Sequence, residues 1–154
     1  MRFSKKTDYA LRALMALAGV YGRRPQPIGH IATVHDIPYR FLQQIMLELK
    51  AQGWVSTQAG RGGGVKLARP PASITMGEVV RHFDGVLAPI GCVSITHYER
   101  CSQEPRCLFR RTLLDIRNHT AELMDRTSLA MLLEGVPPSA AEVFDPHFSD
   151  GAGI

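Results

Sequence analysis

The chain has 154 residues, 45% of them hydrophobic and 21% charged, which suits one globular domain or a small domain with an appendage. No apolar run approaches the roughly 18 residues that span a bilayer, and Asp8 and Arg12 interrupt the stretch where a signal peptide would lie. We therefore expect a cytoplasmic protein with no membrane partner and with reduced cysteines. The net charge of +4 is unevenly distributed, because residues 1–70 contain 11 Lys/Arg and three Asp/Glu whereas the remainder is acidic. A basic half favours a polyanionic partner such as nucleic acid.

The first half of the chain contains three predicted helices. Apolar residues at helical spacing predict a helix over residues 7–20. A second, shorter helix begins at Pro27, because proline suits a first helical turn, and it ends before Pro38. A third helix runs over about residues 38–52, with Gly53 as its C-terminal stop.

A predicted β-hairpin follows the third helix. Residues 54–58 and 65–67 have strand character, and residues 60–64 form a turn with four glycines. Three helices followed by a hairpin are the order of a winged helix-turn-helix. We therefore predict a mainly α-helical protein whose DNA-binding domain spans residues 1–72.

The second half is predicted to contain a cysteine-bearing loop and a dimerisation helix, residues 73–135. The sequence Thr-Met-Gly-Glu at residues 75–78 is a capping box, which starts a helix at Thr75. Residues 88–107 should be irregular, and one long helix should cover about residues 108–133. Its apolar stripe consists of Leu113, Ile116, Thr120, Leu123, Thr127 and Ala130. Such a stripe needs a partner, of which a second copy of the chain is the simplest. Residues 136–154 read as a disordered tail.

The third helix is the predicted recognition helix, whose open side should meet base edges in the major groove. Tyr39, Arg40, Gln43 and Gln44 lie on or near that side, and Arg pairs with guanine as Gln does with adenine. An isolated amphipathic helix would more often present such residues to solvent alone. The position between a helix-turn and a glycine-rich hairpin favours the DNA-reading role.

The glycine-rich turn has two interpretations. A phosphate-binding loop is disfavoured, because no Lys-Ser/Thr pair and no helix follow it. As a wing, it lets the backbone approach DNA and lets Arg61 enter the minor groove. Lys5 would add attraction to phosphates.

All three cysteines, Cys92, Cys101 and Cys107, fall within 16 residues of a polar segment. Thiolates are soft ligands for iron–sulfur clusters, zinc or copper(I). Three unrelated buried thiols are the alternative, but the polar surroundings favour a metal site. A thiol enzyme that used His97 would not need three clustered thiols, so we expect no enzyme activity.

The chain resembles the IscR/NsrR/RirA family of bacterial iron–sulfur winged-helix regulators over residues 1 to about 133. The resemblance rests on MRFSKKTDYALR at residues 1–12, FLQQ at 41–44, GRGGGVKL at 60–67, MGEVV at 76–80 and the three-cysteine loop. It implies a homodimer with crossed long helices, and an iron–sulfur cluster whose gain or loss changes DNA binding. Two-fold symmetry implies a palindromic operator.

The resemblance also bears on the cluster type. Members similar to IscR place a histidine three residues after the last cysteine and bind [2Fe-2S], whereas Arg110 occupies that position here. Members similar to NsrR bind [4Fe-4S] with an aspartate from the partner's first helix, and Asp8 stands at that position. The resemblance therefore favours [4Fe-4S] on three cysteines and Asp8, in a regulator that acts as a repressor. A zinc site or a thiol redox switch is the alternative, and the signal stays open.

Overall fold

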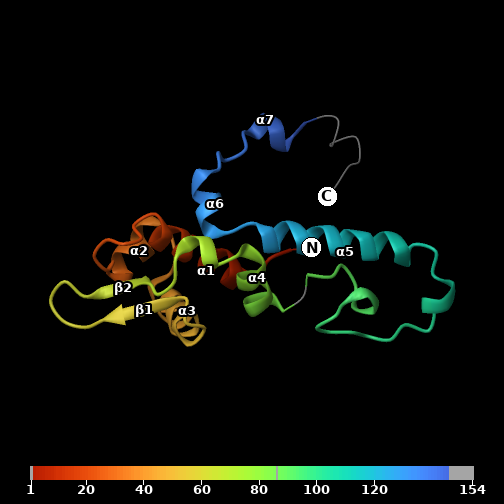
Figure 1. Cartoon of the computed structure of the whole chain (residues 1–154), viewed down its shortest axis with the longest axis horizontal. Coiled ribbons are helices and arrows are strands. Elements are labelled where there is room, and N and C mark those ends of the chain that lie inside the picture. Colours follow the sequence, from red (N-terminus) through yellow and green to blue (C-terminus); the bar gives the residue numbers. More distant parts are fainter. Residues whose placement is uncertain (1, 86, 146–154) are drawn as a thin grey trace.

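The computed structural model describes residues 2–85 and 87–145. The molecule is elongated: a helical unit with a two-stranded hairpin forms one end, and helix α5 extends from it with the cysteine loop alongside (Figure 1). This architecture confirms the predicted mainly α-helical fold with a winged helix-turn-helix. None of the helices among the described residues has the length and apolarity that a membrane crossing requires.

Three helices build the N-terminal unit: α1 (Lys5–Ala18), α2 (Ile28–Val34) and α3 (Tyr39–Ala51). The Ser4 hydroxyl begins α1 by accepting a hydrogen bond from the Thr7 N–H, which replaces a bond that the helix itself cannot supply. Gly53 adopts a positive φ of 71° just beyond α3, and so ends the recognition helix as predicted.

The hairpin consists of β1 (Val55–Gln58) and β2 (Gly64–Leu67), which pair antiparallel with Val55 opposite Leu67. Gln26 extends the ladder through an isolated bridge to Val65. The connection between α1 and α2 is therefore hydrogen-bonded to the base of the wing, so that the wing projects from a fixed position.

One hydrophobic core holds the unit together and reaches beyond residue 72. Helix α4 (Met76–Asp84) begins with the predicted Thr75–Glu78 capping box, and its Val79 is fully buried in the same core as Leu14 and Leu42. The adjoining α6 (Leu129–Glu134) contributes the equally buried Leu129. A single 3₁₀ turn, Pro71–Ser73, connects the hairpin to α4.

The single helix predicted over residues 108–133 is wrong in its extent. The structure contains α5 (Arg110–Arg126), an extended residue at Thr127, and then α6. Hydrogen bonds to the segment before α4 stabilise the break: the Met76 N–H donates to the Thr127 carbonyl, and the Leu129 N–H donates to the Ile74 carbonyl. The Ser128 hydroxyl caps α6 by accepting a hydrogen bond from the Met131 N–H. These bonds turn the chain back onto α1 and bury Leu129.

The C-terminal segment contains a further one-turn helix. Residues 136–145 were included in the predicted disordered tail, but α7 (Ala140–Val143) forms there, begun by a capping box between Ser139 and Glu142. Its residues are exposed. The rest of the predicted tail, residues 146–154, lies outside the described residues.

Candidate nucleic-acid interface and cysteine loop

The outer face of α3 carries the predicted base-reading residues. Leu42, Ile45, Met46 and Leu49 are buried, which leaves Tyr39, Arg40, Gln43 and Gln44 exposed on the opposite side. Gln43 donates a long hydrogen bond of 3.4 Å to the Tyr39 hydroxyl. Arg40 and Gln44 make no side-chain hydrogen bond or ion pair with any described residue. Their donors and acceptors are therefore free for an external partner.

Two further predicted DNA contacts lie on other elements. Arg61 is exposed in the turn that joins β1 to β2, and Lys5 is exposed at the first residue of α1. Neither side chain forms an ion pair within the part of the chain that is described. Both charges thus add to the unbalanced positive charge of the first half of the sequence.

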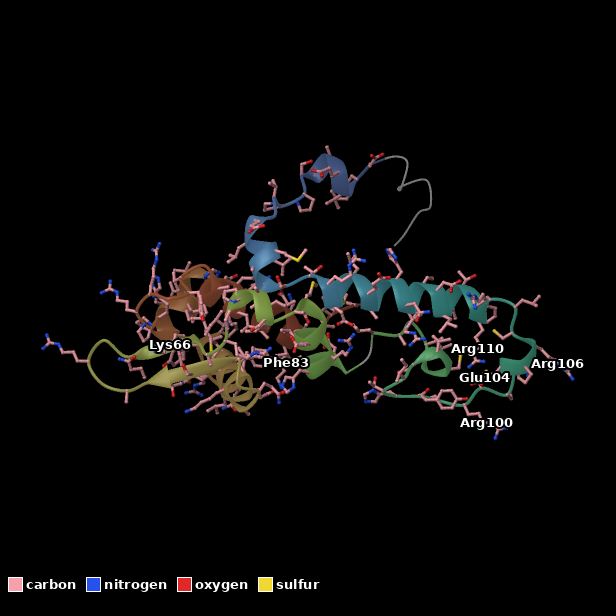
Figure 2. The ribbon with its side chains drawn as sticks, in the orientation of Figure 1. Lys66, Phe83, Arg100, Glu104, Arg106 and Arg110 are labelled. Carbon is pink, nitrogen blue, oxygen red and sulfur yellow. The ribbon has the colours of Figure 1, made fainter. Side chains whose placement is uncertain are left out.

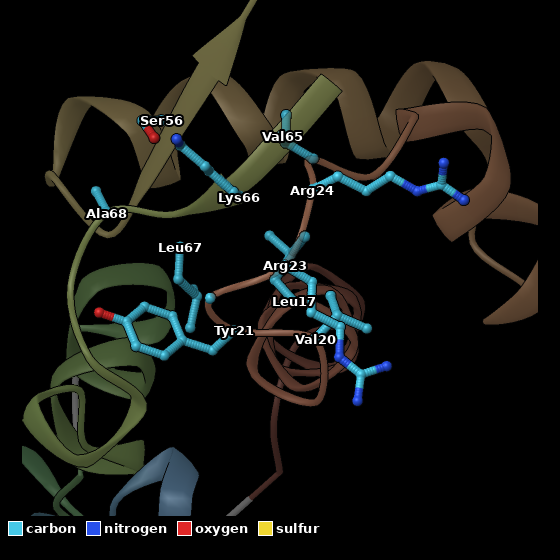
Figure 3. Close-up of a pocket in the computed structure, with 11 residues that line it drawn as sticks. Leu17, Val20, Tyr21, Arg23, Arg24, Ser56, Val65, Lys66, Leu67 and Ala68 are labelled. Atoms are coloured by element: carbon cyan, nitrogen blue, oxygen red, sulfur yellow. The ribbon is translucent and has the colours of Figure 1, made fainter. Parts of the chain in front are cut away.

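A hollow of about 460 Å³ lies at the base of the hairpin, on the side of the α1–α2 connection (Figure 3). Apolar side chains such as Leu17 and Leu67 line it together with three cations, Arg23, Arg24 and Lys66. Figure 3 shows Lys66 beside Ser56, whereas the two arginines point away from the hollow. A small-ligand site needs convergent polar groups. These cations extend the basic surface and do not form such a site.

The three cysteines lie where two short 3₁₀ turns interrupt the loop between α4 and α5. Cys92 is buried within the turn Gly91–Val93, and Cys107 directly follows the turn Glu104–Arg106. Cys101 and Cys107 are half-buried, and all three thiols are free. Sequence reasoning thus placed all three in one irregular segment, as the structure does.

Glu104 and Arg110 hold this loop together, and neither role was predicted. The Glu104 carboxylate accepts from the Tyr98 hydroxyl at 2.7 Å and from the Cys101 N–H at 3.2 Å, and it pairs with Arg110 at 3.2 Å (Figure 2). Arg110 also donates to the Cys92 carbonyl at 2.8 Å. The Tyr98 hydrogen bond, followed by the Cys101 N–H, holds the pKa of Glu104 below its ordinary value. The carboxylate is therefore the form that braces the loop.

The surroundings of the thiols suit an anionic group. Cys92 and Cys107 line one open pocket together with Arg110, Arg111 and Arg117. The Nε atom of Arg117 is buried without an acceptor among the described residues. Arg110 and Arg111 also pair with Glu104 and Asp115, so the open donor of this pocket is the Arg117 Nε atom. Cysteine sulfur is a soft ligand of the kind that holds iron–sulfur clusters. The donor set thus fits an iron–sulfur cluster in its chemistry, although the described residues contain no assembled group of three metal-binding side chains.

Asp8 lies on α1 and is not grouped with the cysteines within the described chain. Its carboxylate accepts two hydrogen bonds from Arg12, at 3.0 and 2.8 Å, in a solvated i,i+4 ion pair on the helix surface. Asp8 also lines an open hollow at the start of α1, beside Phe3, Lys5 and Asp84. The side chain is accessible from outside the chain.

Helix α5 exposes an apolar stripe along its length. Phe109, just before the helix, and Ile116 and Leu123 within it are 65%, 48% and 61% exposed, and they recur at intervals of seven residues. Leu113 and Thr120 lie between them and complete a 3,4 spacing. An adjacent side of the helix packs inward, where Met124 joins Val80 and Leu87 in a second small core. The stripe is unoccupied by other parts of the described chain.

Comparisons with known proteins agree with this architecture. A family model described as Rrf2, iron-dependent transcriptional regulator, matches residues 3–135. An Rrf2-like HTH-type transcriptional regulator of Rhodobacter capsulatus is 35% identical over 144 residues, covering 89% of this chain and 95% of that protein. The HTH-type transcriptional regulator NsrR of Geobacillus kaustophilus is 34% identical over 134 residues, covering 87% and 90%. These proteins are transcriptional regulators and not enzymes, in agreement with the prediction.

Solved structures show the same fold. CymR of B. subtilis, the global cysteine regulator, is similar with a TM-score of 0.77 at 26% identity, covering 89% of this chain and 99% of that one. T. potens IscR has a TM-score of 0.68 at 23% identity, covering 87% of each chain. The second likeness concerns the fold alone.

Proposed function

Because the chain belongs to the Rrf2 family of transcriptional regulators, we propose that it is a homodimeric repressor whose DNA affinity is set by an iron–sulfur cluster. One observation carries the proposal: the same chain presents an exposed DNA-reading face and three free thiols beside an arginine-lined pocket. We assign residues 1–72 to DNA binding, and residues 73–135 to sensing and dimerisation, in a protein that acts in the cytoplasm.

The DNA-reading part uses α3 and the wing. Arg40, Gln43 and Gln44 read base edges, Tyr39 supports Gln43, and Arg61 and Lys5 supply minor-groove and phosphate attraction. A dimer with two-fold symmetry requires a palindromic operator. The free donors on Arg40 and Gln44 support this assignment, because hydrogen bonds within the chain would make them unavailable to DNA.

The dimer forms through the apolar stripe on α5. Two copies that bury Phe109, Ile116 and Leu123 each remove three large apolar side chains from water, and the 3,4 spacing is that of a helix–helix seam. The seam brings two DNA-binding units to the ends of one assembly.

The cluster would be held by the thiolates of Cys92, Cys101 and Cys107, which leave one iron of a [4Fe-4S] cubane without a thiolate. Arg110 cannot serve, since guanidinium has no acceptor and already binds Glu104 and the Cys92 carbonyl. We propose Asp8 from the first helix of the second subunit as the fourth ligand. When bound, such a cluster would be the part of the protein that responds to iron availability, nitric oxide or oxygen.

Ligation by Asp8 would couple the cluster to DNA binding. Asp8 would have to exchange its two bonds to Arg12 for iron, and α1 carries the rest of the DNA-binding unit. Cluster loss would return Asp8 to Arg12 and release the angle of that unit to the dimer axis. The cluster-bound and cluster-free states would then differ in the partner of Asp8, and such a difference is what links cluster binding to DNA affinity.

The test uses three variants purified without oxygen, with absorption and Mössbauer spectra and operator affinity as readouts. Cys101→Ala should lose the cluster. Asp8→Ala should keep an altered cluster whose state no longer changes DNA affinity. Arg12→Ala is the matched control, because it removes the same ion pair but leaves the carboxylate free to ligate. An Asp8→Ala protein with unchanged spectrum and unchanged switching would remove Asp8 from the site.

A second candidate function is a zinc site or thiol redox switch on the same fold. It is favoured by the likeness to the cysteine regulator CymR at 26% identity. The lack of an assembled group of three metal-binding side chains among the described residues favours the thiol switch over a zinc site. Iron and zinc content of the anaerobic protein separates the two. A colourless protein with zinc, or with thiols that form a disulfide in air and thereby change DNA affinity, would replace the cluster.

A further inference from the structure

Leu47 is the most exposed large apolar side chain of the recognition helix. It is 62% exposed, although large apolar residues on the same helix, such as Leu42 and Leu49, are fully buried. A single exposed leucine is ordinary on a protein surface and carries no argument by itself. The position of Leu47 relative to the base-reading residues is what makes it informative.

Leu47 lies in line with those residues. It follows Arg40 by seven positions, which is close to two helical turns, and follows Gln44 by three. It therefore stands at the middle of the face that points away from the core, where it continues the row begun by Arg40 and Gln44. A helix that docks in the major groove along this row brings Leu47 to the bases.

The surroundings of Leu47 form a shallow hollow with an apolar floor. Ile28, Met46 and Leu47 provide the apolar part, and Gln43, Gln44 and Lys50 stand around it. The Lys50 ammonium donates to the Thr57 hydroxyl of β1 at 2.9 Å, so that one side of the hollow is closed by the hairpin. The hollow thus offers an apolar surface between hydrogen-bonding groups that face the same way.

Thymine is the one base whose major-groove edge carries an apolar group, the C5-methyl. We propose that Leu47 contacts a thymine methyl in each operator half-site and so fixes that base pair. This inference rests on the proposed DNA-binding function and adds a residue that recognises by apolar contact, beside the hydrogen-bonding Arg40 and Gln44. Burial of one methyl group against Leu47 corresponds to about a four-fold change in affinity per half-site.

The experiment uses the full-length protein and an operator obtained by selection from a random duplex library. Each thymine of the selected operator is replaced singly by deoxyuridine, which removes only the methyl group, and binding is measured by fluorescence anisotropy at fixed salt. We expect one position per half-site at which the replacement weakens wild-type binding about four-fold. Leu47→Ala should bind the thymine and deoxyuridine operators equally.

Two controls separate the possible failures. Leu133→Ala removes a side chain that is 44% exposed on α6 and should keep the full methyl sensitivity. The thermal midpoint of Leu47→Ala should match that of wild type, because an exposed side chain contributes little to folding. If the selection enriches no duplex, the protein does not bind DNA sequence-specifically, which contradicts both the proposed function and the role of Leu47. An operator that is insensitive to every thymine methyl, or equally sensitive with Leu47→Ala, would overturn the role of Leu47 alone.

Discussion

Leu123 and Met124 are consecutive residues of α5, the first exposed and the second buried, and their replacement separates dimer formation from folding. Leu123 is 61% exposed on the apolar stripe, whereas Met124 is 9% exposed and packs with Val80 and Leu87. Leu123→Ala should weaken the dimer while each subunit keeps its fold. Met124→Ala should destabilise the fold of each subunit.

The magnitudes follow from the exposed fractions. Full burial of a leucine side chain contributes about 1.5–3 kcal/mol, so covering the exposed 61% of Leu123 in both subunits contributes about 2–4 kcal/mol. Because alanine keeps the Cβ, one of the four side-chain carbons, we expect the dimer dissociation constant to rise about 10- to 100-fold. Met124→Ala leaves a cavity in a small core and should cost about 2–5 kcal/mol of folding free energy. Leu123→Asp should abolish the dimer, because the seam would bury an unpaired carboxylate.

Sedimentation velocity over a range of protein concentrations measures the dimer, and urea denaturation at two concentrations measures the fold. The loss of stability in Leu123→Ala should shrink as the protein concentration rises, since mass action restores the dimer. The loss in Met124→Ala should persist at every concentration. A Leu123→Asp protein that remains a soluble dimer would move the interface away from this stripe.

Three further predictions concern the DNA-binding unit and the cysteine loop. Arg40→Ala should reduce the preference for one base at one operator position by about 1–3 kcal/mol, measured by competition between operator variants. Lys5→Ala should weaken binding to all sequences alike and reduce the slope of log K against log salt by about one per subunit. Equal losses on all sequences with Arg40→Ala would contradict the base-reading role. Gly64→Ala should destabilise the wing and lower DNA affinity, because its Cβ would overlap the Gln26 backbone, and unchanged amide-exchange protection of β2 would refute this. Glu104→Ala should release the cysteine loop, seen as faster amide exchange over residues 98–107; unchanged exchange would show that the loop does not depend on this carboxylate.

Local signals predicted the DNA-binding end of the fold well. The capping box at Thr75, the stop at Gly53 and the glycine-rich turn act within a few residues of themselves, so their effects can be read from adjacent sequence. The buried stripe of α3 follows helical spacing directly, which also identified the exposed residues on its other side. Leu47 was missed, because a search for polar base-reading residues passes over an apolar one.

Long-range bonds explain what the sequence did not predict. The helical spacing continues from Leu123 through Ala130, and nothing local marks the break more strongly than Thr127 and Ser128. The break depends on bonds to Ile74 and Met76, about 50 residues away in the chain. The roles of Glu104 and Arg110 are also non-local, since Arg110 reaches the carbonyl of Cys92, 18 positions earlier. Sequence reasoning recognised Arg110 only as a residue that cannot ligate.

The placement of these bonds indicates how a change in the cysteine loop can reach DNA. Arg110 begins α5 and joins it to the loop, whereas the far end of α5 is fixed to α4 by a bidentate Arg81–Asp125 pair. Asp125 raises the pKa of Arg81, so the pair stays charged, and a Cβ at Gly77 would overlap the Asp125 carboxylate. Helix α4 is in turn buried against the DNA-binding core. The DNA-binding unit and the C-terminal end of α5 are therefore held together as one body, and a change in the unit's angle to the dimer axis has to carry this end of α5 with it. A change in the loop should then alter the distance between the two recognition helices of a dimer, and leave base reading within each half-site intact.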